Sequence, residues 1–182
     1  SLQGTITLTI EYPSYTTILN QENIIEPFGV YEGFPLEELD IIEEVGKNMY
    51  RINPPNSSKK FKSYMVTATK ELGVCGMTAS GFVATDDDGH NLRKEYDEFK
   101  SILTGKYGEA YEEDHLLPAS TLDKPEEWLE ALKKEERVLI SGWNIDGTLI
   151  YLEALCIEYY SEKFGLMVSY SYPKYEILRN LQ

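Results

Sequence analysis

The sequence predicts an α+β protein built on an antiparallel sheet, and three observations in its last third predict it. Three runs rich in β-branched and aromatic residues follow one another at residues 137–143, 148–158 and 164–172. Asp146-Gly147 lies between the first two runs, and Asp-Gly between β-runs is a strong hairpin signal. In the third run large apolar residues alternate with small ones, which is typical of a strand with one buried face. Helical patterns flank this meander and do not alternate with single strands, so a doubly wound fold is disfavoured.

The first 46 residues are predicted to form a strand, an irregular stretch and a helix. Residues 5–10 alternate threonine with apolar residues, which indicates an opening strand, and residues 13–33 contain scattered proline and glycine. Pro35 suits the first turn of a helix, and Gly46 suits its end. Between them the apolar residues recur at helical spacing, at Leu36, Leu39, Ile42 and Val45.

The remaining elements follow from similar patterns. A short strand at 49–52 precedes a hairpin formed by 61–70 and 73–85, and a loose acidic segment is expected at 109–114. Two helices are predicted around this segment, one from an Asn91 N-cap and one entered through Pro125. Their apolar stripes are Leu92, Tyr96, Phe99, Ile102, Leu103 and Tyr107 for the first, and Trp128, Leu129 and Leu132 for the second. A short C-terminal helix follows Pro173, with Tyr175, Ile177, Leu178 and Leu181 on its apolar side.

We interpret residues 1–182 as a single domain. Its order of elements also suggests two halves with an α-β-β-β outline, at 33–108 and 123–182, and an internal duplication is left open. Cys75 and Cys156 lie within predicted strands, so we expect two buried free thiols, although a disulfide is not excluded by sequence.

The net charge of −14 disfavours nucleic acid and anionic membranes as partners, because both require basic patches. No apolar run approaches the roughly 18–20 residues of a membrane span, and no signal peptide is visible. We therefore expect a cytoplasmic protein, and removal of an export signal before residue 1 is left open.

Acidic residues dominate the start of the chain, where no lysine or arginine precedes Lys47. Five of them, on the outer side of the helix predicted after Pro35, form the candidate binding surface: Glu37, Glu38, Asp40, Glu43 and Glu44. Such a surface attracts a basic protein partner by electrostatic steering, whereas the simpler interpretation is a solvated acidic face. The acidic segment 109–114 is a second candidate docking surface.

The run Gly33-Phe34-Pro35-Leu36-Glu37-Glu38-Leu39, continuing through Val45-Gly46 to a short strand and a hairpin, resembles the small BamE/SmpA-like and β-lactamase-inhibitor-like modules. Those modules lay a helix that ends at glycine on an antiparallel meander. The resemblance covers residues 33–85 and implies a non-catalytic, protein-binding module. It implies no specific functional residue.

One stretch has the spacing of a calcium loop. Asp86, Asp88 and Glu95 are weak candidate metal ligands at positions 3, 5 and 12 of the EF-hand pattern, with Gly89 at the bend. The alternative interpretation is a polar turn that caps the following helix. His90 and His115 stand alone in polar segments, and no other metal spacing is present.

These observations favour a small non-enzymatic protein that binds another protein, in the manner of an inhibitor or immunity protein. The alternative is a hydrolase whose carboxylates act as acid and base in a tyrosine-lined groove between the halves. A calcium-responsive module built on Asp86, Asp88 and Glu95 is a third hypothesis. No cofactor is expected, and the sequence does not predict the oligomeric state.

Overall fold

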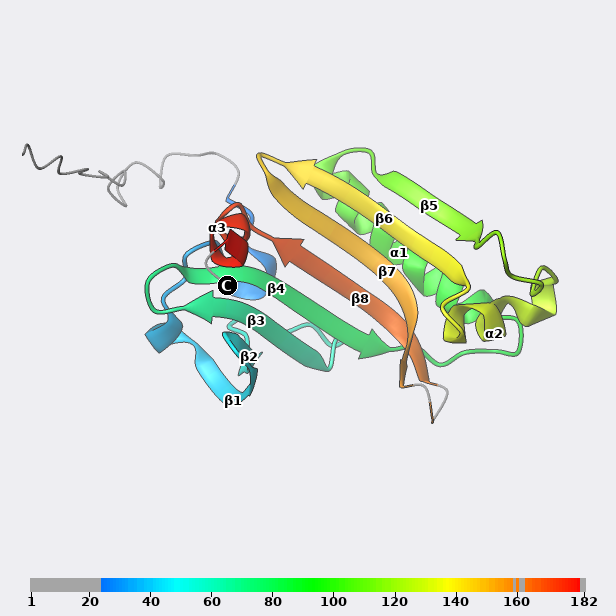
Figure 1. The fold of residues 1–182 in the computed structure, drawn as a ribbon, viewed down its shortest axis with the longest axis horizontal. Coiled ribbons are helices and arrows are strands. Elements are labelled where there is room, and N and C mark those ends of the chain that lie inside the picture. The colour runs from blue at the N-terminus through cyan, green and yellow to red at the C-terminus, as the bar shows by residue number, and fades with distance from the viewer. Residues whose placement is uncertain (1–23, 159, 161–162, 181–182) are drawn as a thin grey trace, which may run out of the picture.

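The protein is built on one eight-stranded antiparallel sheet, with strand order β1-β2-β3-β4-β8-β7-β6-β5 (Figure 1). The structure, a computed structural model, describes residues 24–158, 160 and 163–180, so the strand predicted at residues 5–10 lies outside it. The predicted α+β class with an antiparallel meander is confirmed. The strands are β1 Asp40–Gly46, β2 Met49–Asn53, β3 Ser63–Thr69, β4 Gly73–Phe82, β5 Tyr111–Leu116, β6 Arg137–Ile145, β7 Thr148–Glu158 and β8 Lys163–Ser171.

The sheet consists of two four-stranded meanders that meet where β4 pairs with β8. Hydroxyl groups of Thr78 and Ser169 form a hydrogen bond across this junction, at 3.3 Å. In the second meander β6 and β7 are joined at Asp146-Gly147, where both residues have positive φ (50° and 85°). Positive φ at both central residues suits the right-handed twist of a hairpin, so the turn predicted here is confirmed.

One face of the sheet is covered and the other is largely open. On β8 the side chains of Phe164, Leu166, Val168 and Tyr170 are buried. They face the hydrophobic core beneath helices α1 (His90–Tyr107) and α2 (Trp128–Lys133). Figure 1 shows α1 running across the sheet behind β6 and β7. Helix α3 (Lys174–Asn180) lies toward the other face at the β4 end, because Tyr175 approaches Gly76 of β4.

Helix α1 is fixed to the second meander by polar contacts as well as by its apolar residues. The Tyr96 and Ser141 hydroxyls lie 2.6 Å apart and are fully buried. Burial raises the pKa of the Tyr96 phenol, because the charged form would be desolvated. Trp143 Nε1 donates a hydrogen bond to the Gly108 carbonyl at 2.8 Å, where the helix ends. The predicted stripe is wrong at Ile102, which is 60% exposed.

The helix predicted over residues 35–46 is wrong. Leu36–Glu38 forms a single 3₁₀ turn, and the chain then continues as β1, paired with β2. Asn48 has positive φ (60°), which allows a tight turn after Gly46 and lets β2 fold back on β1. The β-branched residues of β1, Ile41, Ile42 and Val45, also favour a strand. The α-β-β-β outline of the first half is therefore wrong in its first element.

The prediction of a loose loop at 109–114 is also wrong. Residues 111–116 form β5, which lies on the edge of the second meander. The two later helices are confirmed: a 3₁₀ turn at Pro125–Glu127 leads into α2, and α3 follows Pro173. Helix α1 begins after Gly89, two residues before the predicted Asn91 cap. Both cysteines are free of disulfide bonds; Cys75 is buried and Cys156 partly so. Within the described ranges, no helix is long and apolar enough to cross a membrane.

Candidate functional site

The strand β1 forms one outer edge of the sheet and is the least buried strand in it. It pairs with β2 on one side only, and six of its seven residues are exposed. The edge of a sheet presents unpaired backbone N–H and C=O groups, which can pair with a further strand. We call the surface formed by β1 and the preceding 3₁₀ turn, residues 36–46, the acidic edge.

All five predicted acidic residues lie on the acidic edge, but they do not share one helix face. Glu37 and Glu38 belong to the 3₁₀ turn, and the other three belong to β1. Asp40 accepts a hydrogen bond from Asn53 Nδ2 at 3.0 Å, and Glu43 forms an ion pair with Arg51, so both interact with β2. Three acids have neither an ion-pair partner nor a side-chain hydrogen bond among the described residues: Glu37, Glu38 and Glu44.

The acidic edge also exposes apolar side chains. Ile41 is 39% exposed, Ile42 is 54% exposed and Val45 is 41% exposed. The register of β1 against β2 shifts twice, between Ile41 and Glu43 and between Glu44 and Gly46. Such bulges interrupt the alternation of side chains between the two faces of the strand. The combination provides hydrophobic contact, negative charge and unpaired backbone groups in one place.

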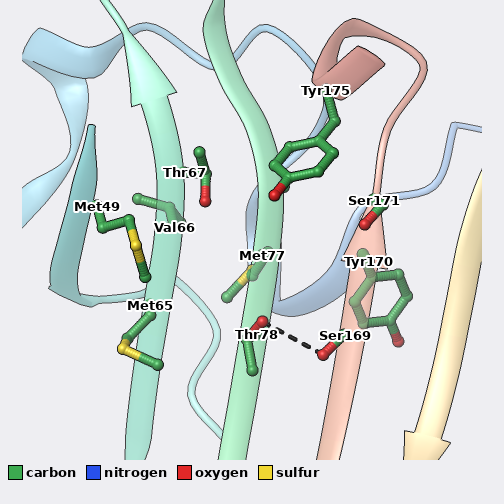
Figure 2. Close-up of a pocket in the computed structure, with 11 residues that line it drawn as sticks. Met49, Met65, Val66, Thr67, Met77, Thr78, Ser169, Tyr170, Ser171 and Tyr175 are labelled. Atoms are coloured by element: carbon green, nitrogen blue, oxygen red, sulfur yellow. Dashed lines mark hydrogen bonds between the residues drawn. The ribbon is translucent and has the colours of Figure 1, made fainter. Parts of the chain in front are cut away.

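A shallow hollow opens on the uncovered face of the sheet, beside β2 (Figure 2). Its volume is about 170 Å³, and Figure 2 shows Tyr175 of α3 lying over β4 on one side of it and Met49 and Met65 on the other. Hydroxyl groups of Thr67, Thr78, Ser169 and Ser171 also line it. No charged residue and no histidine lines it, so its hydroxyl groups have no general base in the hollow to activate them as nucleophiles.

The sequence prediction did not single out the residues of this hollow. The alternation of small residues with large ones in β8 predicted a small-residue face, and that face contains Ser169 and Ser171. The contribution of Tyr175 and Met49 depends on how α3 and β2 pack, which no local pattern indicates.

The Asp86–Glu95 stretch forms a helix-capping turn. Asp86 accepts a hydrogen bond from the Asn91 backbone N–H at 3.0 Å, and Asp88 accepts one from the His90 N–H at 3.1 Å. These donors stabilise carboxylates, and the bond from Asn91 lowers the pKa of Asp86. Glu95 lies on α1 and binds Lys60 at 2.5 Å. The structure therefore confirms the turn-and-cap interpretation, and it places no group of three or more potential metal ligands together among the residues it describes.

One of the described carboxylates, that of Glu153, has a pKa above its usual value. Glu153 lies on the open face of β7, opposite Ile140 and Met167 of the neighbouring strands. Desolvation raises the pKa of Glu153, and the negative charge of Glu135 adds to the effect. Glu153 does not line the hollow of Figure 2. The hydrolase hypothesis needs a second carboxylate across a cleft, so it stays a prediction.

The other residues considered for chemistry lie apart from one another. His90 is the first residue of α1, and His115 lies in β5; both are exposed. Ser141 is buried against Tyr96 rather than open to a substrate. His115 lies on β5, the edge strand at the opposite end of the sheet order from β1.

Comparison with protein-family models, with curated proteins and with solved structures finds no match to this chain. The resemblance to BamE/SmpA-like modules stays a prediction. The helix that it implied near Glu37 is a 3₁₀ turn and a strand in the structure.

Proposed function

We propose that this protein is a binding module that takes up an extended, basic segment of a partner protein along the acidic edge. The single observation that supports it is the exposure of β1, an edge strand that keeps three β-branched apolar side chains and the unpaired Glu44 in solvent. A strand that served only the fold would bury one of its two faces.

Strand addition fits this edge better than surface contact alone. An added strand would satisfy the unpaired N–H and C=O groups of β1, and main-chain hydrogen bonds of this kind provide affinity in β-augmented complexes. Ile42 and Val45 would contact alternate side chains of the added segment. The residues of the partner that oppose Glu38 and Glu44 would be lysine or arginine.

The charge of the acidic edge argues for a basic partner and against a second copy of the chain. Two β1 strands paired with each other would bring Asp40, Glu43 and Glu44 of one copy beside the same residues of the other. Like charges in such positions cost free energy, which is a recognised way to prevent self-association. A basic strand meets no such penalty.

The test uses a fluorescein-labelled octapeptide of alternating lysine and valine, measured by fluorescence anisotropy against the full chain. Two comparison peptides separate the contributions: alternating glutamate and valine reverses the charge, and alternating lysine and proline keeps the charge but cannot pair as a strand. The variant Glu38→Lys/Glu44→Lys changes the acidic edge without breaking an ion pair, and Glu71→Lys/Glu126→Lys makes the same change of net charge elsewhere.

We expect the lysine–valine peptide to bind, and we expect Glu38→Lys/Glu44→Lys to weaken it by about tenfold or more while the control variant changes it little. Equal losses in both variants would show nonspecific attraction to an acidic protein and would overturn the proposal. Equal binding of the lysine–proline peptide would exclude strand addition. A dimer that forms without peptide and is lost in Ile42→Lys would identify a second copy as the occupant instead.

A more specific role for this binding module is part of the same proposal. An inhibitor or immunity role, which the resemblance to inhibitor-like modules implies, corresponds to a partner whose own active or binding segment is basic and extended. The division of the chain into duplicated halves is likewise a proposal, supported by the presence of four consecutive antiparallel strands in each meander.

A further inference from the structure

A second hollow lies at the end of β4, beside the first half of α1. Its volume is about 470 Å³, within the range of roughly 300–1,000 Å³ that is usual for small-molecule sites. Residues 59–62 border it on one side and α1 on the other, and Gly81 and Leu166, which are paired neighbours in the sheet, lie between them. We call it the lysine groove, because Lys59, Lys60, Lys62 and Lys94 line it.

The two borders of the groove pack on the sheet separately and touch at a few side chains, such as Phe61 with Phe99 and Lys60 with Glu95. Residues 59–62 lie tight against β4: a Cβ at Gly81 would come within 2.0 Å of the Lys60 carbonyl oxygen, and the Lys62 N–H donates to the Ser80 carbonyl at 2.8 Å. Helix α1 packs mainly over β6, β7 and β8. The segment and the helix thus pack mainly on different strands, and the groove lies between them.

Part of the groove is lined by apolar side chains. Phe61 and Phe99 meet edge to face, with ring centroids 5.2 Å apart, and join the segment to the helix. Leu166 is buried beneath them, and Phe82, at the end of β4, is 45% exposed. An exposed aromatic ring beside a hollow gives a ligand apolar surface to bury.

The rim of the groove is positively charged, in a protein whose net charge is −14. Lys60 binds Glu95 at 2.5 Å and approaches Glu98 at 3.6 Å. The other three lysines have no ion-pair partner among the residues that the structure describes. Four ammonium groups thus face two carboxylates, and the local charge has the opposite sign to that of the whole chain.

We propose that the lysine groove binds a small organic anion with an apolar body, of which a medium-chain fatty acid is the simplest example. The chain of the ligand contacts Phe61, Phe99 and Phe82, and its carboxylate is held by Lys62 and Lys94. Hydrogen bonds from ammonium groups to a carboxylate are charge-assisted and therefore stronger than neutral ones. The site is separate from the acidic edge and does not depend on the function proposed there.

The experiment measures binding of decanoate to the full chain by isothermal titration calorimetry, below the concentration at which decanoate forms micelles. Acetate has the same head group without the body, and decanol has the same body without the charge. The variant Lys62→Gln/Lys94→Gln removes two rim charges, and Lys47→Gln/Lys70→Gln removes two exposed lysines that do not line the groove.

We expect decanoate to bind and acetate and decanol each to bind at least about tenfold more weakly, because each lacks one part of the recognition. The groove variant is expected to weaken decanoate by about tenfold, and the control variant by less than about twofold. No decanoate binding at millimolar concentration would overturn the proposal. Equal loss in both variants would do the same, because it would show that decanoate responds to the overall charge of the protein and not to the lysines of the groove. Loss of lysine–valine peptide binding in the groove variant would show that the two sites are not separate.

Discussion

The two edge strands of the sheet are both acidic, but only in one of them do most of the acids have a lysine or arginine partner. In β5, Asp114 binds Arg137 at 2.6 Å, Glu112 pairs with Lys100 of α1, and Glu113 lies 3.7 Å from His115. In β1, Glu43 alone has a cationic partner among the described residues. The β5 acids thus attach the strand to α1 and β6, whereas most of the acidic edge interacts with solvent. An acidic run in a sequence therefore becomes a candidate docking surface only when the fold supplies it with few cations.

A comparison of apolar residues in the centre of the sheet and on the acidic edge gives the largest expected effect on stability. Ile150 is fully buried in the centre of the sheet, and Ile42 is 54% exposed on β1. We expect Ile150→Ala to lower the free energy of unfolding by about 2–5 kcal/mol, because it leaves a cavity in the core. Ile42→Ala should cost less than about 0.5 kcal/mol, because its side chain fills no core space. Urea unfolding measures both.

If Ile150→Ala does not fold, Ile150→Val gives the same comparison at about 0.5–1.5 kcal/mol. A cost for Ile42→Ala as large as that for Ile150 would show that β1 is held by its own packing. The acidic edge would then lose the observation that supports a partner. Ile42→Ala should also weaken the lysine–valine peptide, which the core variant should not do while it remains folded.

Removing one acid from each edge is expected to change the free energy of unfolding by a smaller amount. The loss is expected at β5 and not at the acidic edge. Asp114→Asn removes the ion pair with half-buried Arg137 and should cost about 0.2–1 kcal/mol, less at high salt. Glu44→Gln, on the acidic edge, removes an unpaired charge from an already negative protein and should be neutral or slightly stabilising. Equal costs at both edges in urea unfolding at low salt would contradict the distinction between them.

A third acid, between the two edges, gives the smallest effect. Desolvation raises the pKa of Glu153, so the folded chain binds this proton more tightly than the unfolded chain. Stability is therefore lost as the pH rises from the unfolded value of about 4.3 through the higher folded value. Glu153→Gln should raise the melting temperature by about 1–3 °C at pH 7. The gain should disappear at pH 4, where the carboxyl group is largely protonated.

Thermal unfolding monitored by circular dichroism at the two pH values checks this, with Glu126→Gln as a control for the loss of one charge. A gain for Glu153→Gln that persists unchanged at pH 4 would show that the amide improves packing, rather than that the charge is costly.

Most of the fold could be predicted because its signals are local. The Asp146-Gly147 turn and the alternation in β8 depend on neighbouring residues, and both are confirmed. The error at residues 36–46 has a physical cause. Apolar residues three apart in the sequence fit a helix, whereas a strand is recognised by strict alternation of apolar and polar residues. The two bulges of β1 remove that alternation, so the sequence carried no strand pattern against the helix. The turn around Asn48 was the available signal against the helix.

The candidate sites were harder to predict, because they depend on long-range neighbours. The acids of β5 could not be told apart from those of β1 until Lys100 and Arg137 were placed beside them. The lysine groove combines residues 59–62 with Lys94, which a folded α1 brings together. The run Lys59-Lys60-Phe61-Lys62 contains most of the basic rim, and it was the one signal that could have pointed to this groove.

The junction between β4 and β8 has a consequence for how the chain reaches this structure. Thr78 and Ser169, which bond across it, are 91 residues apart in the sequence. Pairings of such long range close slowly, because the entropy of a large loop is lost before the contacts form. During synthesis β4 stays an open edge until β8 has been made, and it is rich in small and apolar residues. The centre of the finished sheet is thus the part of the nascent chain most exposed to wrong pairing.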